Sequence, residues 1–524
     1  MTGLIRLLAL AAMALAPASA HAEWKEATSA NFIVYSEGSD QQLKDFSAKL
    51  EKFNFILRTF HKVTAPPSVN KLKVYLFPDI KAVGRMAGSD RVAGYYVTEA
   101  RGPMMVGTRS SASTASIDSE SILLHEYAHH FMYQYFPATY PTWYSEGFAE
   151  FWGSTKILDG DIVEVGAPAE YRFGSFFENR WLPIRQLLTA QSYADVPELD
   201  LLYAEGWLLV RYVFDNDKRR QQLQTYLAAI NGGATYADAA AKSFPDVGAL
   251  NSEIFSFARR MRFSVVRLPF RPIDPGAINL RTLRPAEQAL LEYEIKINQG
   301  FLQSEAQEFA NKVRSVAGRY LTDPFALAIL AETEGLAGNK AAALTATEKL
   351  LAIQPDHARA LTQKAMLQID SLRAAGSTDK AAWQAARQPI VRARKAAPND
   401  PIVLEAFHRS YLEQGVLPPE AAQNALYTAM ELAPSDNDLR YRVARDFEQR
   451  NLIREAIAII RPSAYVLPHR KTESEREKKK REEREEKYRG AGQQRRETAR
   501  EMLDRLQKKL SETSALSAAG TATG

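Results

Sequence analysis

The spacing of apolar and polar residues predicts both strands and helices in the first 135 residues of the chain. Apolar residues recur at helical spacing from Leu43 to Phe60, and Ser39 precedes them as an N-capping residue. A second helix is expected to begin near residue 118 or 119. Four short runs of apolar residues have the length of strands: 31–36, 71–77, 95–97 and 104–106. The pattern therefore predicts an α+β region in which a small sheet is followed by helices.

Helical spacing continues from about residue 177 to 262, and prolines then interrupt it. We expect a linker over 264–284, preceded by a domain over 23–263. Beyond the linker, helical segments are separated by prolines that lie 31, 43 and 36 residues apart: Pro324, Pro355, Pro398 and Pro434. These intervals lie near the period of about 34 residues of tetratricopeptide repeats, which the region resembles. We therefore expect an all-α, tetratricopeptide-like solenoid over 285–465.

The two ends of the chain differ from the rest in composition. Arg6 precedes an apolar run, and small residues lie just before Glu23, so residues 1–22 have the form of a secretory signal peptide. No other stretch has the roughly 20 apolar residues that a membrane-spanning helix requires. Residues 466–524 are highly charged, with 16 Lys and Arg against 10 Asp and Glu between 470 and 510. We expect them to form a disordered or solvated helical tail, because they cannot bury a core.

Composition limits the classes of function. The chain of 524 residues has a net charge of +5, but the positive balance belongs to the tail and predicts no nucleic-acid partner for the body. Cysteine is absent, which excludes disulfides and a lipid on an N-terminal cysteine. Any metal site must then use His, Asp and Glu. Together with the signal peptide, these features predict a periplasmic or secreted protein without a membrane span.

Three of the eight histidines lie within six positions, in the sequence HEYAHH (125–130). His125 and His129 are four residues apart, so on a helix both imidazoles face one side and can bind one ion at about 2.0–2.1 Å. Glu126 lies about 100° around the helix from His125, where it can reach a water at such an ion without being a ligand. His130 lies about 140° from His125 and is expected to pack or to support the site. The spacing is that of the H-E-x-x-H zinc motif.

A catalytic zinc site normally has a third protein ligand and one open position. No histidine follows His130 before His357, so the ligand is expected among the acidic residues, and Glu146 in WYSEGFAEF is the best placed. Prolines separate two predicted helices here, and a second helix folded back antiparallel would bring Glu146 to the two motif histidines. Glu150, one turn further, is expected to accept a ring N–H from a ligating histidine. Gly147 would allow the two backbones to approach closely.

The sequence HEYAHH…PTWYSEGFAEF resembles the gluzincin zinc metallopeptidases of the thermolysin and aminopeptidase clan, and most of all the peptidase MA-like families of exported bacterial proteins. The resemblance is close over residues 121–153 and only general elsewhere. It implies one Zn²⁺ ion held by His125, His129 and Glu146. It also implies that Glu126 is the general base and that Glu150 supports the ligands.

The same resemblance implies roles outside the motif. Members of the clan hold substrate along an edge strand that precedes the motif helix, and GPMMVG (102–107) matches that place, with Met104, Met105 and Val106 as substrate-binding residues. Members also often place a tyrosine or histidine near the oxyanion. Tyr203 is a candidate for this role, against the simpler interpretation as a core aromatic residue. The aminopeptidase signature G-x-M-E-N is absent, so specificity for an N-terminal residue is not implied.

Two hypotheses about function follow. In the first, the protein is an exported zinc-dependent metallopeptidase that acts on a peptide or protein substrate, and its repeats recruit a protein partner or that substrate. In the second, it is a non-catalytic envelope binding or scaffold protein with an inactive metalloprotease-like domain. The intact Glu126 favours the first, since an inactive descendant does not need a general base. A hydrolase of another amide, such as that of cell-wall peptide, would use the same site.

Overall fold

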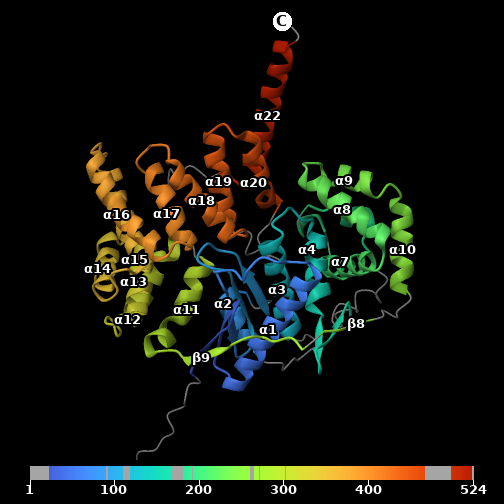
Figure 1. The fold of residues 1–524 in the computed structure, drawn as a ribbon, viewed down its shortest axis with the longest axis horizontal. Coiled ribbons are helices and arrows are strands. Elements are labelled where there is room, and N and C mark those ends of the chain that lie inside the picture. Colours follow the sequence, from blue (N-terminus) through green and yellow to red (C-terminus); the bar gives the residue numbers. More distant parts are fainter. Residues whose placement is uncertain are drawn as a thin grey trace, which may run out of the picture.

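Apart from residues 192, 197 and 271, the computed structural model describes seven stretches of the chain: 23–89, 92–109, 119–167, 181–259, 265–300, 303–465 and 497–521. The predicted signal peptide and residues 466–496 of the predicted tail lie outside them. A sheet with its helices forms the first half, and the paired helices that follow curve over the sheet (Figure 1). Among the described residues, no helix is long and apolar enough to cross a membrane.

Six strands form the main sheet, in the order β4-β5-β3-β2-β1-β9. Strands β2, β3 and β5 are parallel, whereas β1, β4 and β9 pair antiparallel with their neighbours. The four strands expected from the sequence are confirmed, and β1 and β9 add to them. Their bounds are Lys25–Thr28 (β1), Phe32–Ser36 (β2), Leu72–Phe77 (β3), Gly94–Val97 (β4), Met104–Thr108 (β5) and Asn279–Thr282 (β9).

Helices cover both faces of this sheet, because successive side chains of a strand point to opposite faces. Val34 and Met105 pack with α1 and α3 on one face, and Tyr35 and Tyr75 pack with α2 and α11 on the other. Helix α1 begins after Ser39, which forms the expected N-cap. The bounds of these helices are Asp40–Phe60 (α1), Ile80–Ala87 (α2), Ser119–Tyr135 (α3) and Pro285–Gln299 (α11).

Helix α4 (Thr142–Gly153) lies between α3 and α7 (Leu199–Phe214) and packs against both. Among the described helices, α8 (Asp217–Asn231) and α10 (Val247–Arg259) also pack against α7, and α6 (Ile184–Thr189) packs against α9 (Tyr236–Ser243) and α10. Three short strands form a second sheet in the order β6-β7-β8. Their bounds are Lys156–Leu158 (β6), which follows α4 in the chain, Ile162–Val165 (β7) and Val266–Pro269 (β8). The helices that carry the H-E-x-x-H motif and Glu146 are therefore central in the first half of the chain.

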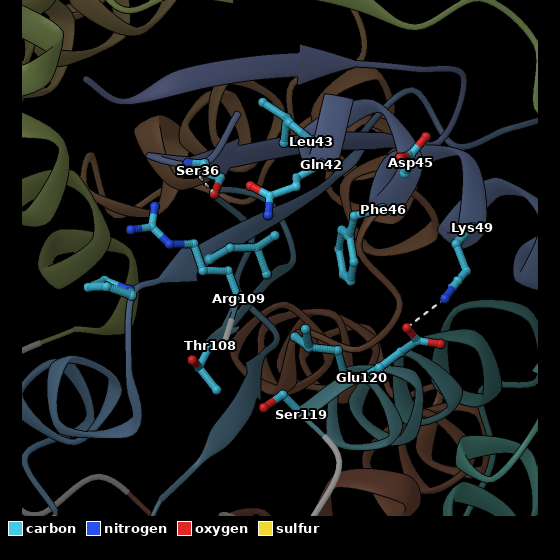
Figure 2. A pocket seen from close by; sticks show the side chains of 14 residues that line it. Ser36, Gln42, Leu43, Asp45, Phe46, Lys49, Thr108, Arg109, Ser119 and Glu120 are labelled. Carbon is cyan, nitrogen blue, oxygen red and sulfur yellow. Dashed lines mark hydrogen bonds and ion pairs between the residues drawn. The ribbon is translucent and has the colours of Figure 1, made fainter. Parts of the chain in front are cut away.

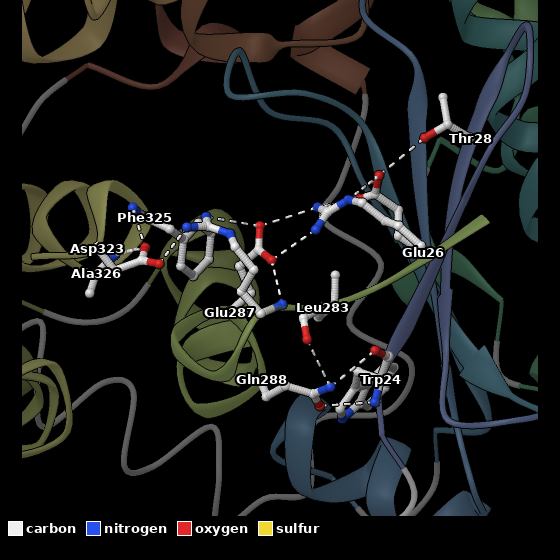
Figure 3. A network of polar contacts seen from close by, with 11 residues as sticks. Trp24, Glu26, Thr28, Leu283, Glu287, Gln288, Asp323, Phe325 and Ala326 are labelled. Atoms are coloured by element: carbon white, nitrogen blue, oxygen red, sulfur yellow. Dashed lines mark hydrogen bonds and ion pairs between the residues drawn. The ribbon is translucent and has the colours of Figure 1, made fainter. Parts of the chain in front are cut away.

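Residues 264–284, which we expected to be a linker, contribute a strand to each sheet. Strand β8 pairs with β7, and β9 pairs with β1. Figure 3 shows the polar network that contains Glu26 and Glu287. Arg281 of β9 donates hydrogen bonds to Glu26 at 2.6 Å and to Glu287 of α11 at 2.8 Å. The prolines prevent a helix, as expected, but extended backbone between them can still pair at a sheet edge. The segment thus joins the first repeat helix to the sheet.

From α11 onward each helix packs against the next, and the first helices of successive pairs also pack together, α13 on α15 and α15 on α17. Asp323 and Asp400 cap α13 and α17, and a proline follows each at the first helical position. This stacking forms a tetratricopeptide-like solenoid. The bounds are α12 Ala306–Ala317, α13 Pro324–Leu336, α14 Lys340–Ile353, α15 Ala358–Ala374, α16 Lys380–Ala396, α17 Pro401–Leu412, α18 Glu420–Leu432, α19 Asn437–Gln449 and α20 Ile453–Tyr465.

The described part of the tail is not wholly solvated. Helix α22 (Ala499–Thr521) packs against α20 through Met502, Leu503 and Leu506, all of which are buried. The three residues lie on one face of the helix. The apolar stripe that they form is narrower than that of a helix that packs fully against a core. The sequence left open whether the tail is disordered or a solvated helix, and it did not predict this contact with the last repeat.

Two glycines allow α4 and α7 to cross closely. A Cβ atom on Gly206 would lie 2.6 Å from the carbonyl oxygen of Trp143, and one on Gly147 would lie 2.3 Å from that of Gly206. We predict that Gly206→Ala lowers the free energy of unfolding by about 2–3 kcal/mol, because main-chain atoms must move. Gly248→Ala is the control, since its nearest neighbour is the Asp246 side chain at 3.5 Å and alanine favours a helix. Urea denaturation measures both, and equal stability of the two variants would contradict the prediction.

Candidate metal centre

Helix α3 places both histidines of the H-E-x-x-H motif on one side. The Nε2 atoms of His125 and His129 lie 3.1 Å apart. Both side chains are buried, and Glu126, the next residue after His125, is buried as well. The described part of the helix runs from Ser119 to Tyr135. The spacing of four residues has therefore brought two imidazole nitrogens to one point inside the protein.

Glu146 of α4 completes a cluster of three potential ligand atoms. Its Oε2 lies 3.3 Å from Nε2 of His125 and 3.5 Å from Nε2 of His129. In the part of the chain that the structure describes, this is the one group of His, Asp and Glu side chains whose ligand atoms converge in this way. The three residues expected to bind a metal are thus brought together, and a metal ion can bind there.

The two helices that carry these residues approach closely at Gly153. A Cβ atom on Gly153 would lie 2.9 Å from the Cβ atom of His125. The sequence led us to expect this role of Gly147, but Gly147 faces Gly206 of α7 instead. Both glycines lie on α4, and each permits contact with a different neighbouring helix.

The three ligand atoms have the spacing expected around one small cation. In a tetrahedral zinc site with bonds of about 2.0–2.1 Å, two ligand atoms lie about 3.3 Å apart. The observed separations are 3.1, 3.3 and 3.5 Å. Two imidazoles and one carboxylate also match the donor set of catalytic zinc sites, which leave a fourth position open. The residues therefore fit zinc.

The carboxylate of this cluster is completely buried, and its neighbours favour the ionised form. Burial alone would raise the pKa of Glu146, but the neighbouring imidazoles of His129 and His125 outweigh it. They hold the pKa of Glu146 well below its usual range. A cation bound between the three residues would stabilise the ionised carboxylate in the same way.

Both histidines have a polar side chain near the second ring nitrogen. Oε1 of Glu150 lies 3.7 Å from Nδ1 of His125, on the expected side but beyond hydrogen-bond distance. Oγ of Ser145 lies 3.4 Å from Nδ1 of His129 and 2.9 Å from the hydroxyl of Tyr133. Such partners orient a ligating imidazole and select its tautomer. The sequence indicated Glu150, whereas Ser145 and Tyr133 were missed because nothing in the motif points to them.

Two tyrosines of the later segments reach this cluster. Tyr193 donates a hydrogen bond to Oε1 of Glu146. Burial and the charge of Glu146 raise the pKa of Tyr193 well above its usual value, so it remains protonated at neutral pH. Tyr203 of α7 is buried with its ring centroid 6.3 Å from that of His125. The sequence suggested Tyr203 but carried no signal for Tyr193, which lies in a short 3-10 turn 47 residues beyond Glu146.

The strand expected to bind substrate is not at an edge of the sheet. Strand β5 pairs with β3 on one side and with β4 on the other, and the side chains of Met104, Met105 and Val106 are all 0% exposed. Its main chain therefore has no free side to which an extended peptide could pair. The outer strand is β4. Because β4 and β5 follow each other in the chain, the sequence predicted both strands without showing which one lies outside.

His130 lies apart from the three ligands, as helix geometry predicted. Its Nδ1 atom and the hydroxyl of Tyr96 on β4 share a hydrogen bond of 2.8 Å. Burial lowers the pKa of His130 to about 3, so its ring is neutral. His130 thus connects the motif helix to the outer strand of the sheet.

A separate hollow of about 700 Å³ opens at the carboxyl ends of β2, β3 and β5 (Figure 2). Arg109 lines it, and Lys49 of α1 pairs with Glu120 of α3 at 2.6 Å on its wall. Ligands often bind at the carboxyl ends of parallel strands. The three candidate metal ligands do not line this hollow, so it is distinct from the metal centre.

No protein-family model and no curated protein matches the chain. The solved structures that match include a thermophilic TPR protein from Thermus thermophilus, with 17% identity over 34% of this chain and 86% of that protein and a TM-score of 0.28. A tetratricopeptide repeat protein from Parabacteroides merdae matches at 17% identity over 54% and 99% of the two chains, with a TM-score of 0.26. MamA from Desulfovibrio magneticus matches at 16% identity over 33% and 90%, with a TM-score of 0.24. These scores are low, so the description of the repeats depends on the helix packing of this chain.

We predict that Glu146→Ala abolishes binding of added zinc, because it removes one of the three candidate ligands. Glu150→Gln is expected to weaken binding by about 10–100-fold, since it removes the negative charge that lies 3.7 Å from Nδ1 of His125. Zinc content after dialysis and affinity in competition with a chelator measure the two effects. Glu120→Gln, on α3 but paired with Lys49, is the control and should bind zinc normally. Full zinc occupancy of the Glu146→Ala chain would contradict the assignment.

Glu205 of α7 is a buried carboxyl group whose Oε1 accepts the main-chain N–H of Leu182 at 2.6 Å. Burial raises its pKa from 4.5 to about 8. The folded state therefore holds the proton more tightly than the unfolded state, so stability is lost as pH rises from about 4.5 to about 8. We predict that Glu205→Gln removes this loss and gains on the order of a few kcal/mol relative to wild type between pH 5 and pH 8. Urea denaturation at pH 5 and pH 8 measures the stability of both proteins. A difference between variant and wild type that is the same at the two pH values would refute the prediction.

Proposed function

We propose that this protein is an exported, zinc-dependent metallopeptidase that acts in the periplasm or outside the cell. The observation that carries the proposal is the convergence of His125, His129 and Glu146 at ligand spacing, with Glu126 on the same helix. Structural zinc sites usually have four protein ligands, whereas catalytic sites have three. Three candidate ligands, with a further buried carboxyl group on the helix that carries two of them, therefore favour catalysis over a structural role.

The residues of the centre have distinct roles in this proposal. When bound, zinc supplies Lewis acidity, which favours the addition of water to a peptide carbonyl near neutral pH. Glu126 removes a proton from the attacking water and delivers it to the leaving amine. Tyr193 holds the carboxylate of Glu146 in place through its hydroxyl group. Tyr203, beside His125, is the candidate donor to the developing oxyanion.

The second candidate function is a non-catalytic envelope scaffold. The stacked helices α11 to α20 favour it, because arrays of this kind present extended surfaces to protein partners. In that case a metal ion bound by His125, His129 and Glu146 stabilises the fold, and Glu126 has no catalytic role. In the peptidase proposal the same repeats recruit a protein partner or the substrate. A hydrolase of cell-wall peptide amides would use the same residues and differ only in its substrate.

We predict that the purified, zinc-loaded chain cleaves members of a peptide library and that Glu126→Gln lowers kcat by at least about 100-fold, because the general base is lost. Zinc content should remain unchanged, since Glu126 is not a ligand. Mass spectrometry of the digest measures cleavage, and metal analysis of the same samples measures zinc.

Two further variants separate the roles of the tyrosines in the same assay. Tyr203→Phe should lower kcat with little change in KM or zinc content, whereas Tyr193→Phe should weaken zinc binding through Glu146. Glu120→Gln serves again as the matched control and should cleave normally. Bound zinc without any cleavage that depends on Glu126 would refute the peptidase and support the scaffold.

A further inference from the structure

The loop between β4 and β5, residues 98–103, packs against the repeats. Ala100 is 9% exposed and belongs to one apolar cluster with Ile369, Trp383 and Leu439. Among the described residues of that cluster, Ala100 is the only member from outside the repeats. A residue of the sheet domain thus contributes to the core of the solenoid.

Polar contacts hold the loop at three helices. The main-chain N–H of Ala100 donates to Oδ2 of Asp436 at 2.5 Å, while the other oxygen of Asp436 caps α19. Arg101 forms an ion pair with Glu332 of α13, and its carbonyl oxygen accepts a hydrogen bond of 3.2 Å from Arg359 of α15. Charged groups of the repeats therefore recognise both the main chain and the guanidinium group of the loop.

The loop lies at a hollow between helices of the repeats. Helices α13, α15 and α17 line a hollow of about 440 Å³, and Arg101 forms part of its wall. We call this surface the inner face and define it by five residues around the hollow: Glu332, His357, Arg359, Gln363 and Asp370. It carries both acidic and basic groups and is already partly filled by the chain itself.

A short series of contacts leads from the loop to the metal centre. The hydroxyl of Tyr96, on the strand that enters the loop, is hydrogen-bonded to His130 at 2.8 Å and lies near the side chain of Ser435. Ser435 directly precedes Asp436, and His130 directly follows His129. One corner of the repeats therefore contacts the loop, the outer strand and, through Tyr96, the helix that carries the motif.

We propose that the inner face of the repeats is a binding site for an arginine-bearing turn. The 98–103 loop is the ligand that occupies this site in the folded chain. The contact between them positions β4 and α3 for metal binding. Asp436 and Ser435 are then positioning residues that act through the loop, Tyr96 and His130. A tethered ligand is present at an effective concentration on the order of millimolar, so only a tighter peptide of the same chemistry displaces it. Binding of such a peptide and binding of the metal are thereby coupled.

A charge exchange in the full-length chain tests the contact. Arg101→Glu should speed amide hydrogen exchange in 94–97 and 119–135 and weaken zinc binding, each by about tenfold, because an ion pair becomes a repulsion. Adding Glu332→Arg should restore both, which a general loss of folding would not allow. Failure of the second substitution to restore exchange and zinc affinity would overturn the proposal.

A capping variant tests the other contact without loss of the helix cap. Asp436→Asn keeps an oxygen for the cap of α19 but replaces the acceptor of the Ala100 N–H, so it should also speed exchange in β4 and α3. Asp379→Asn, at the cap of α16, is the matched control, and should leave that exchange unchanged. Equal exchange in both variants would contradict the positioning role of Asp436.

Competition by a peptide tests the inner face directly. A labelled peptide of residues 97–104 should bind the Arg101→Ala chain at least about tenfold more tightly than wild type, because the resident loop is weakened. Adding Glu332→Ala should remove that binding. Equal binding of the peptide to the wild-type and Arg101→Ala chains, or no binding to either, would refute the binding site on the inner face.

These measurements need no turnover, so their failure is distinguishable from that of the proposed peptidase. If the double variant restores hydrogen exchange but the protein shows no cleavage that depends on Glu126, the peptidase proposal is refuted and the coupling between loop and metal centre stands. If the protein cleaves peptides but the double variant does not restore hydrogen exchange, the coupling is refuted and the peptidase proposal stands.

Discussion

The buried carboxylate of Glu146 is the group on which the arrangement around the metal centre depends. An ionised carboxylate that is removed from water is costly unless charge or hydrogen-bond donors surround it. His125, His129 and Tyr193 provide that surrounding, so two helices and a distant turn must meet at one point. Close packing of α3 and α4 at Gly153 makes the meeting possible. The same requirement would be met more fully by a bound cation.

The sheet and the repeats are continuous in packing as well as in sequence. Helix α11, the first of the repeat region, covers one face of the sheet through Leu291 and Ile295. Strand β9 immediately before it pairs with β1, and the loop over 98–103 reaches in the opposite direction, from the sheet into the solenoid. Each part therefore buries apolar surface of the other. Removing the repeats would expose both the helical cover of the sheet and the contacts of the loop, so the two parts are not independent modules.

Several features were predictable because they depend on neighbours in the sequence. The helical stacking of His125 and His129 follows from a separation of four residues, and the N-cap at Ser39 follows from its own side chain. Glu146 was predictable because only a short turn separates its helix from the motif. The order of β4 and β5 was not, since both strands carry apolar residues suited to an interior position. The glycines of α4 show the same limit: their presence indicates close contact, but not which helix each one faces.

Local chemistry in the sequence predicted four strands of the main sheet, the helix of the motif, the repeat pattern and the three residues that converge at the metal centre, because periodicity, capping and short turns act over a few residues. The tertiary structure alone decided that Tyr193 bonds Glu146, that the expected linker enters two sheets, and that the 98–103 loop lies on the repeats. These contacts join residues far apart in the chain. Their existence depends on how whole elements pack, since a hydrogen bond or an ion pair forms only between groups that the rest of the fold has already brought within about 3 Å.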